Sequence, residues 1–209
     1  QPNSEDEYRI ASEVWAKACK DIPAGRAGEP VELEDVNLDE ILLVESFGIQ
    51  QHRSRGQEAK VREIHNFKAN RANSCAFMPQ KMRYDTLDNA VEALNTMATS
   101  IDDSRRDFLI GKSDFKSAFK TLPRSEQHAW LCWALIYNPQ AYRYQVVPLW
   151  TQTFGSLGGI TAWYRTARAV QHILLTLFSL VVFFFVDDAF WPGLAIQVDG
   201  HRSQAEWIK

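Results

Sequence analysis

The sequence has few of the features that define several large classes of protein. It holds three cysteines, Cys19, Cys75 and Cys132, with no CxxC pair and no Cys/His cluster at zinc-binding spacing, which argues against a disulfide scaffold and a structural zinc site. Its acidic first residues are not a signal peptide, and it shows no internal repeat. We therefore expect reduced, mostly buried thiols and an intracellular protein.

The sequence also lacks a long apolar run. The longest one, Ile173 to Val186, has 14 residues and ends at Asp187 and Asp188, whereas a membrane-spanning helix needs about 20. We expect a buried segment here. A membrane-associated protein is the alternative, and the two carboxylates argue against it.

Charge is small in total but unevenly distributed. The net charge is −3, while residues 1–50 carry 4 basic and 12 acidic side chains and residues 51–209 carry 19 and 14. A hydrophobic fraction of 45% excludes a disordered chain. The basic part permits a nucleic-acid partner without requiring one.

Local patterns predict an α+β fold, with helices packed on one face of an antiparallel sheet after a helical leader. Helical patterns cover residues 5–21, 38–45, 85–99 and 158–175, and we expect Asn37 to cap the second of these helices. Strand patterns cover residues 47–52, 60–67, 107–114, 129–137, 142–149, 179–186 and 190–198.

Carboxylates follow two of the apolar strands. Asp114 ends the strand over 107–114, and Asp187 and Asp188 follow the strand over 179–186. Burying an unpaired carboxylate is costly. If the strands are neighbours, the three carboxylates converge, and Mg²⁺ or Mn²⁺ is their natural counter-ion. A surface turn is the alternative explanation for the Asp-Asp pair.

Four segments carry a family resemblance when they are taken in order. They are Lys60-Val61-Arg62-Glu63-Ile64-His65-Asn66-Phe67 followed by Asn73, Ser113-Asp114-Phe115-Lys116-Ser117-Ala118-Phe119, Phe154-Gly155-Ser156, and Phe185-Val186-Asp187-Asp188. They are similar to the fingers strand, the first and second palm motifs and the [YF]-x-Asp-Asp motif of reverse transcriptases. The region from about 47 to 190 therefore resembles the fingers and palm of a retroelement reverse transcriptase.

The resemblance implies an RNA-directed DNA polymerase that works by two-metal nucleotidyl transfer. Asp114 and Asp187 would hold two Mg²⁺ (or Mn²⁺) ions, with Asp188 as the supporting catalytic and metal-site carboxylate. Implied partners are an RNA or DNA template with its primer, deoxynucleoside triphosphates and other domains of a longer polyprotein, with no membrane.

The resemblance also implies substrate-binding residues. Arg62 and, less directly, Lys60 would reach the incoming triphosphate. Phe119 would be a steric gate that excludes a 2′-hydroxyl, and Phe154 and Gly155 would lie at the templating base pair. Further basic side chains would contact template–primer phosphates: Arg53, Arg55, Lys68, Arg71, Arg165 and Arg168.

On this interpretation the chain divides into four segments. They are an acidic helical leader (1–46), a fingers-like region (47–106), a palm-like region with the metal-binding carboxylates (107–200) and a truncated end (201–209), with the thumb absent. We expect a fragment of a retroelement polyprotein.

Two departures from the family pattern leave alternatives open. His65-Asn66 stands where the family usually has Asp-Asp, and an insertion separates Pro148 from Phe154. These departures motivate a catalytically degenerate, reverse-transcriptase-like nucleic-acid-binding protein as an alternative. An RNA-dependent RNA polymerase is a weaker alternative, because Phe119 would block ribonucleotides and because Gly-Asp-Asp is more usual in that class.

Overall fold

The structure is a computed structural model that describes residues 2–51, 59–78, 81–100 and 108–194. The described residues form a mixed α+β fold, as expected, in two compact units. Unit 1 consists of residues 1–79 and 119–160, and unit 2 of residues 80–118 and 161–209. The predicted end segment 201–209 lies outside the described residues.

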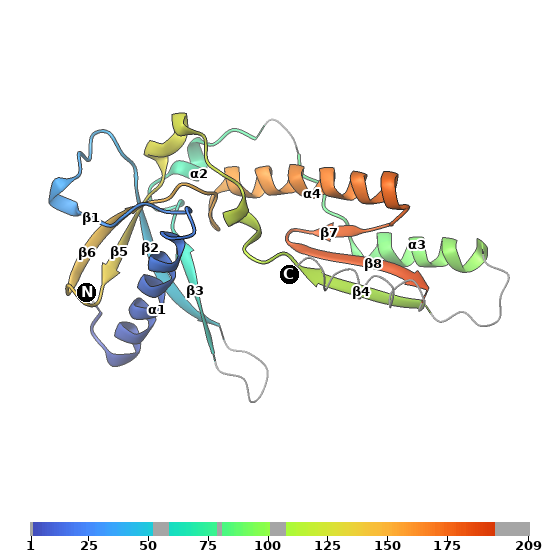
Figure 1. The fold of residues 1–209 in the computed structure, drawn as a ribbon, viewed down its shortest axis with the longest axis horizontal. Helices are drawn as coiled ribbons and strands as arrows, with labels where there is room; N and C mark the ends of the chain where they lie inside the picture. Colours follow the sequence, from blue (N-terminus) through green and yellow to red (C-terminus); the bar gives the residue numbers. More distant parts are fainter. Residues whose placement is uncertain (1, 52–58, 79–80, 101–107, 195–209) are drawn as a thin grey trace. The chain divides into compact units, whose positions relative to one another are not determined.

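Unit 1 is built on a five-stranded sheet (Figure 1). Its strands, in spatial order, are β1 (Val31–Glu32), β6 (Arg143–Pro148), β5 (Trp133–Asn138), β2 (Leu43–Gln51) and β3 (Lys60–His65). β2 and β5 are parallel, so the expectation of a wholly antiparallel sheet is wrong. A parallel pair needs a long connection, and here the chain passes through residues 80–118 of unit 2 between β3 and β5.

Helix α1 (Glu5–Asp21) packs on β2, β3 and β5, and confirms the helix expected over residues 5–21. It begins at Ser4, whose Oγ accepts a hydrogen bond from the Glu7 amide. Val14 is buried with Trp15 and Ala18. Gly48 of β2 permits the close packing, because a Cβ there would lie 2.4 Å from Ile10 Cγ2 and 2.9 Å from Val14 Cγ2.

The helix expected over 38–45 is wrong, because residues 38–40 form a turn and β2 starts at Leu43. Asn37 does not cap a helix. Its Oδ1 accepts a hydrogen bond from the Asp39 amide, two residues on, which closes a local turn. The segment then extends, and Leu43 and Val44 pair with β5.

Unit 2 contains a three-stranded antiparallel sheet in the order β4 (Phe108–Asp114), β8 (Asp188–Leu194) and β7 (Phe183–Phe185). Helix α3 (Leu87–Ser100) contacts β8. Helix α4 (Leu157–Phe178) begins in unit 1 and continues into unit 2. Shorter elements are α2 (Ala72–Cys75) and 3-10 helices at Leu33–Asp35, Ala118–Thr121 and Glu126–Leu131.

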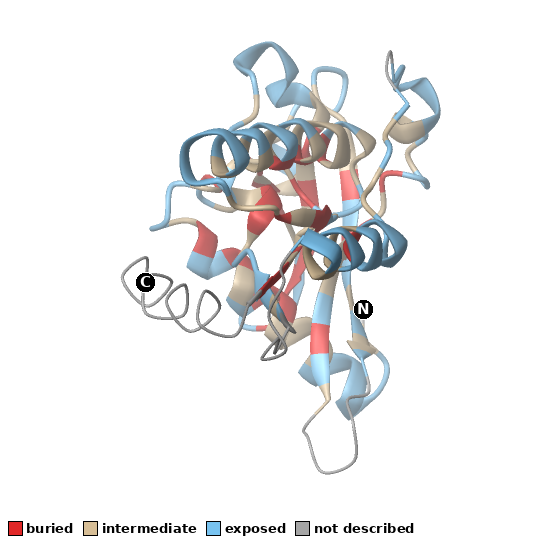
Figure 2. Cartoon of the chain, turned by 90° about the vertical axis from the view of Figure 1, so that its right-hand side faces the viewer, coloured by how far each residue is buried: buried red, intermediate tan, exposed pale blue. Residues whose placement is uncertain are grey.

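Buried residues gather on the strands and on the helix faces turned toward them (Figure 2). The core of unit 1 joins Val14 and Trp15 of α1 to Val44, Val61 and Ile136 of the sheet. Apolar burial of this kind stabilises the fold by about 25 cal/mol per Å². This core supports β3, the unit 1 strand that carries Lys60 and Arg62.

The apolar run from Ile173 to Val186 is buried only in part, at Val182 and Phe184. Its first part is the end of α4, where Leu175 is 51% and Leu177 71% exposed, and its last part enters β7. In the described part of the chain, no helix combines the length and apolarity needed to cross a bilayer.

The expectation of mostly buried thiols is wrong as well. Cys132 is buried, while Cys19 and Cys75 are exposed. Burial raises the pKa of the Cys132 thiol to about 11, so this side chain behaves as a small apolar group.

Candidate active site

Three acidic residues lie at one end of the unit 2 sheet. Asp114 is the last residue of β4, and its antiparallel partner is Asp188, the first residue of β8. Asp187 precedes it in the turn that joins β7 to β8. Partners in an antiparallel pair share a face and lie about 4.5–5.5 Å apart. The expected neighbours, the strands over 107–114 and 179–186, are not paired with each other; β8 lies between β4 and β7, and it brings Asp188 beside Asp114.

The turn between β7 and β8 is held by two hydrogen bonds. The Phe115 amide donates to the Asp187 carbonyl at 3.2 Å, and the Trp163 indole Nε1 of α4 donates to the Val186 carbonyl at 2.7 Å. Val186 has a φ of 57°, which is rare for a β-branched residue and costs free energy. The surrounding contacts maintain this strained conformation beside the carboxylates.

An aromatic cluster packs beside the turn. Trp163 is 4% exposed, and its ring lies 5.3 Å from that of Phe115. Phe115 also contacts Phe184 of β7, at a centroid distance of 5.8 Å. Phe115, the residue after Asp114, thus packs between the Trp163 indole and Phe184 of the strand before Asp187.

The three carboxylates differ in their partners. Asp188 Oδ2 lies 2.9 Å from the Lys112 ammonium. Among the residues that the structure describes, Asp114 and Asp187 make no ion pair, and no three His, Cys, Asp or Glu side chains form a ready metal-binding group. Carboxylate oxygens at a partly exposed strand end are nevertheless a donor type that suits Mg²⁺ or Mn²⁺. The carboxylates of Asp114 and Asp187 are therefore of a type that suits such a cation, while the carboxylate of Asp188 is paired with Lys112.

Asp85, which the sequence analysis did not single out, ties β7 to α4. Its Oδ1 accepts from Arg168 at 3.0 Å, and its Oδ2 accepts from Gln171 Nε2 and from the Phe184 amide, both at 2.9 Å. Gln171 Nε2 also donates to the Val182 carbonyl. Arg168, expected to contact nucleic acid, is therefore engaged within unit 2.

The predicted triphosphate-binding residues lie in unit 1, on β3. Lys60 and Arg62 are exposed and share one face of the strand, since side chains alternate along it. Arg62 Nε donates to Gln51 Oε1 at 2.5 Å across the β2–β3 pair. Arg53 and Arg55 lie outside the described residues.

Gly155 adopts a conformation that only glycine fits. Its φ is +97°, and a Cβ there would approach the His65 carbonyl oxygen to 2.4 Å. Asn73 bonds both sides of this turn, because its Nδ2 donates to the Gly155 carbonyl at 2.7 Å and its Oδ1 accepts from the Leu157 amide at 2.9 Å. The second-motif turn and the start of α4 are thereby fixed to α2, and the turn lies against the end of β3.

His65 is buried, and burial lowers the pKa of its imidazole. Its Nδ1 lies 2.7 Å from Ser46 Oγ, and its Nε2 lies 3.7 Å from Glu63 Oε1. Asn66 Oδ1 accepts from the Ala69 amide at 3.1 Å, which forms a local turn. The His65-Asn66 pair, unusual for the resembled family, is thus fully accommodated in unit 1.

Phe119, the predicted steric gate, is buried with 1% of its surface exposed. Its ring lies 4.4 Å from that of Phe154, which is 44% exposed. The two predicted substrate-binding rings therefore contact each other. In this conformation Phe119 offers no open face to a sugar, and Phe154 is the ring that reaches the surface.

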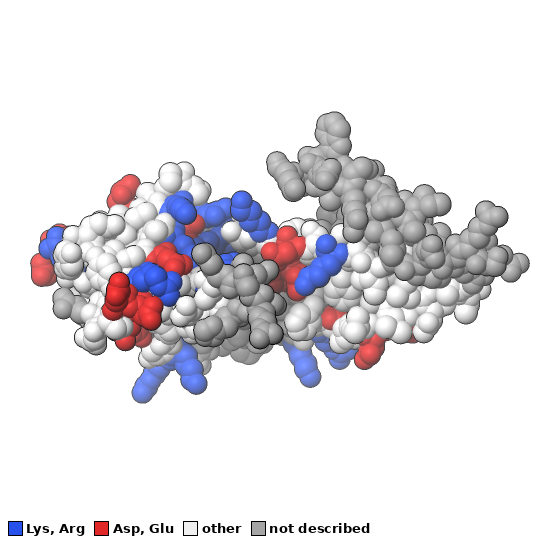
Figure 3. All heavy atoms as spheres, turned by 90° about the horizontal axis from the view of Figure 1, so that it is seen from below, with Lys and Arg blue, Asp and Glu red and all other residues white. Residues whose placement is uncertain are grey.

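The acidic leader is partly neutralised by neighbouring cations. The Lys120 ammonium contacts Asp21 and lies 3.3 Å from Glu63 Oε2. Burial lowers the pKa of Lys120, but Glu63 and Asp21 together outweigh it, so the pKa is raised overall. Figure 3 shows acidic and basic side chains side by side on the face it draws. Other pairs involving the leader join Arg9 to Asp6 and Glu13, Arg26 to Asp21, and Arg143 to Glu32.

The structure adds residues that motif spacing did not assign, namely Lys112, Asp85 and Trp163. Lys112 had a usable signal, because it lies two residues before Asp114 and must share its face of the strand. Asp85 and Trp163 act through partners far away in sequence, and no local pattern indicates them.

Comparison with known proteins does not supply a family. No protein-family model matches the chain, and no curated protein is significantly similar to it. Function is therefore inferred from the positions of Asp114, Asp187 and Asp188 and from the four ordered motifs.

Proposed function

We propose that this chain is the fingers and palm portion of an RNA-directed DNA polymerase of retroelement type. The single observation that carries the proposal is the register of β4 and β8, which pairs Asp114 with Asp188 and places Asp187 in the adjoining turn. The resemblance of the four ordered motifs gives this arrangement its chemical meaning.

In the proposed reaction, the carboxylates hold divalent cations at the strand ends. Two such ions, when bound, activate the primer 3′-hydroxyl and neutralise the triphosphate and the departing pyrophosphate. Asp114 and Asp187 have no competing ion pair among the described residues, and are assigned as the main ligands. Asp188 is assigned a supporting role. The strained turn at Val186 and the Trp163 hydrogen bond orient the carboxylates before substrate arrives.

The residues to which the resemblance assigns substrate contacts belong to unit 1. Arg62 can hold phosphate oxygens through its planar guanidinium, with Lys60 on the same strand face. Gly155 gives the backbone a bare surface for a templating base pair, and the turn is kept in shape by Asn73. Exposed Phe154 is the ring available for contact with a base or sugar. The implied partners are a template–primer duplex and deoxynucleoside triphosphates.

Primer extension tests the proposal. The 209-residue chain is given an RNA template, a DNA primer and deoxynucleoside triphosphates with Mg²⁺ or Mn²⁺. We expect incorporation that Asp114→Asn and Asp187→Asn abolish. Asp88→Asn is the matched control, because it removes an exposed acidic charge from the first turn of α3 in the same unit.

The same assay separates the alternative function. A catalytically degenerate nucleic-acid-binding protein is favoured by one observation, the ion pair that occupies Asp188. On that alternative the folded chain binds a template–primer duplex, with an affinity that falls as salt rises, yet incorporates nothing with either cation. That combined result would replace the polymerase proposal.

A further inference from the structure

The side chain of Lys112 lies beside the proposed metal site. It is an exposed residue of β4, and its ammonium lies 2.9 Å from Asp188 Oδ2. Lys112 and Asp114 are two residues apart on one strand and so share a face, which Asp188 also shares as the partner of Asp114. One face of the sheet therefore carries two carboxylates and one lysine at the same end.

A cation at this end of the sheet would share Asp188 with the Lys112 ammonium, and in the described residues no three His, Cys, Asp or Glu side chains form a ready metal-binding group. The ammonium of Lys112 offsets part of the negative potential of the Asp188 carboxylate. A divalent cation must therefore compete with Lys112 for Asp188, or bind only Asp114 and Asp187. The pair is not buried, since the Lys112 side chain is 63% and the Asp188 side chain 39% exposed. Exposed ion pairs are weak and exchange readily, so a cation can displace this one.

We propose that Lys112 is a resident counter-ion of the catalytic carboxylates: it holds Asp188 away from the divalent cation and weakens cation binding at Asp114 and Asp187. This inference rests on the proposed function, because it deepens the assignment of that site. It makes Lys112 a positioning residue that acts through Asp188. Cation affinity is then set by a balance between the lysine and the incoming metal, and not by the carboxylates alone.

Direct titration with Mn²⁺ tests the inference without any polymerase reaction. Free Mn²⁺ is measured by electron paramagnetic resonance in the presence of the 209-residue chain, with no nucleotide and no template. Removing a single positive charge a few ångströms from a divalent cation in a solvated site tightens binding by about three- to tenfold. We therefore expect Lys112→Met to bind Mn²⁺ about three- to tenfold more tightly, and this gain to shrink as KCl is raised. Lys112→Arg preserves the charge and should stay within about twofold of the parent chain.

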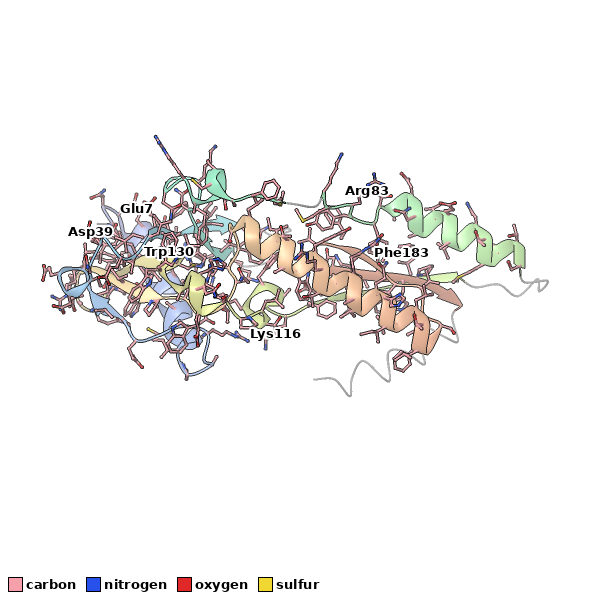
Figure 4. The ribbon with its side chains drawn as sticks, turned by 90° about the horizontal axis from the view of Figure 1, so that it is seen from above. Glu7, Asp39, Arg83, Lys116, Trp130 and Phe183 are labelled. Carbon is pink, nitrogen blue, oxygen red and sulfur yellow. The ribbon has the colours of Figure 1, made fainter. Side chains whose placement is uncertain are left out.

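Lys116→Met is the matched control. Lys116 is exposed in the turn after β4 (Figure 4) and makes no ion pair among the described residues. Its removal changes the net charge equally, two residues beyond Asp114, without freeing Asp188. Its effect should therefore be clearly smaller than that of Lys112→Met. Asp114→Asn should abolish binding, which locates the measured site.

The outcomes separate this inference from the proposed function. Mn²⁺ binding that is lost in Asp114→Asn but unchanged or weakened in Lys112→Met overturns the counter-ion role alone. Tightening by Lys112→Met in a chain that incorporates no nucleotide supports the counter-ion role and counts against polymerase activity. Absence of Mn²⁺ binding to the folded parent chain overturns both.

Discussion

Replacing Gly155 by alanine tests the turn that joins the second motif to β3. The backbone at Gly155 has a φ of +97°, and an added Cβ would lie 2.4 Å from the His65 carbonyl oxygen, a backbone atom that cannot rotate away. The conformational strain costs about 1–2 kcal/mol. Movement of the turn also weakens the hydrogen bond from Asn73 Nδ2 to the Gly155 carbonyl, worth about 1 kcal/mol. We expect the free energy of unfolding to fall by about 2–3 kcal/mol.

Gly158→Ala is the matched control for this substitution. Gly158 lies in the first turn of α4, and an added Cβ there meets its nearest atom, Ser156 Oγ, only at 3.7 Å. Alanine is favoured over glycine in a helix by up to about 1 kcal/mol, so this variant should be as stable as the parent or slightly more so. Urea denaturation followed by circular dichroism measures both variants. Equal stabilities for Gly155→Ala and Gly158→Ala would refute the close approach to His65.

Three further predictions follow from the other contacts. Burial lowers the pKa of His65 in the folded chain, so the unfolded chain binds the proton more readily. The free energy of unfolding should therefore decrease as the pH falls below the unfolded pKa of about 6.5. Urea titrations at pH 7.5 and 5.5 should show a smaller pH dependence for His65→Gln than for the parent chain. Asp85→Asn should lower the free energy of unfolding by about 1–2 kcal/mol, because three donors share its carboxylate, while exposed Asp88→Asn should change it little. Phe119→Val should lower the free energy of unfolding by about 2–3 kcal/mol, because buried volume is lost. In primer extension, incorporation of ribonucleotides by this variant would support the steric-gate role. Unchanged discrimination between ribose and deoxyribose would refute that role.

Local sequence patterns predicted elements whose signal is contained within one segment. The helical spacing of apolar residues placed α1 and α3, and the apolar run before Asp114 placed β4. The start of β2 was missed, because the Asn37 side chain closes a turn where a helix cap was expected. An asparagine next to acidic residues is compatible with either structure, and only the pairing of β2 with β5 decides between them.

The candidate site was predicted in part, for a similar reason. The sequence predicted that Asp114, Asp187 and Asp188 converge if the strands over 107–114 and 179–186 are neighbours, but the neighbour of β4 is β8, and the β4–β8 register pairs Asp114 with Asp188. The sequence does not show which side chain of β4 contacts Asp188 of β8. The contact with Lys112 could therefore be found only in the structure. The burial of Phe119 also depends on a distant residue, Phe154. Tertiary packing covers only part of the apolar surface of α4. It buries Trp163 and leaves Leu175 and Leu177 at the end of the helix exposed.

Single-nucleotide incorporation by two variants of the chain tests whether Asp114 is a metal ligand of a polymerase site. On an RNA template with a DNA primer and Mg²⁺, Asp114→Asn should lose activity by at least about 1,000-fold, as expected when a main ligand of a two-metal site is removed. Asp88→Asn, with its charge removed from an exposed turn of the same unit, should retain the activity of the parent chain. Incorporation that survives Asp114→Asn, or a folded parent chain that incorporates nothing with Mg²⁺ or Mn²⁺, would contradict the account.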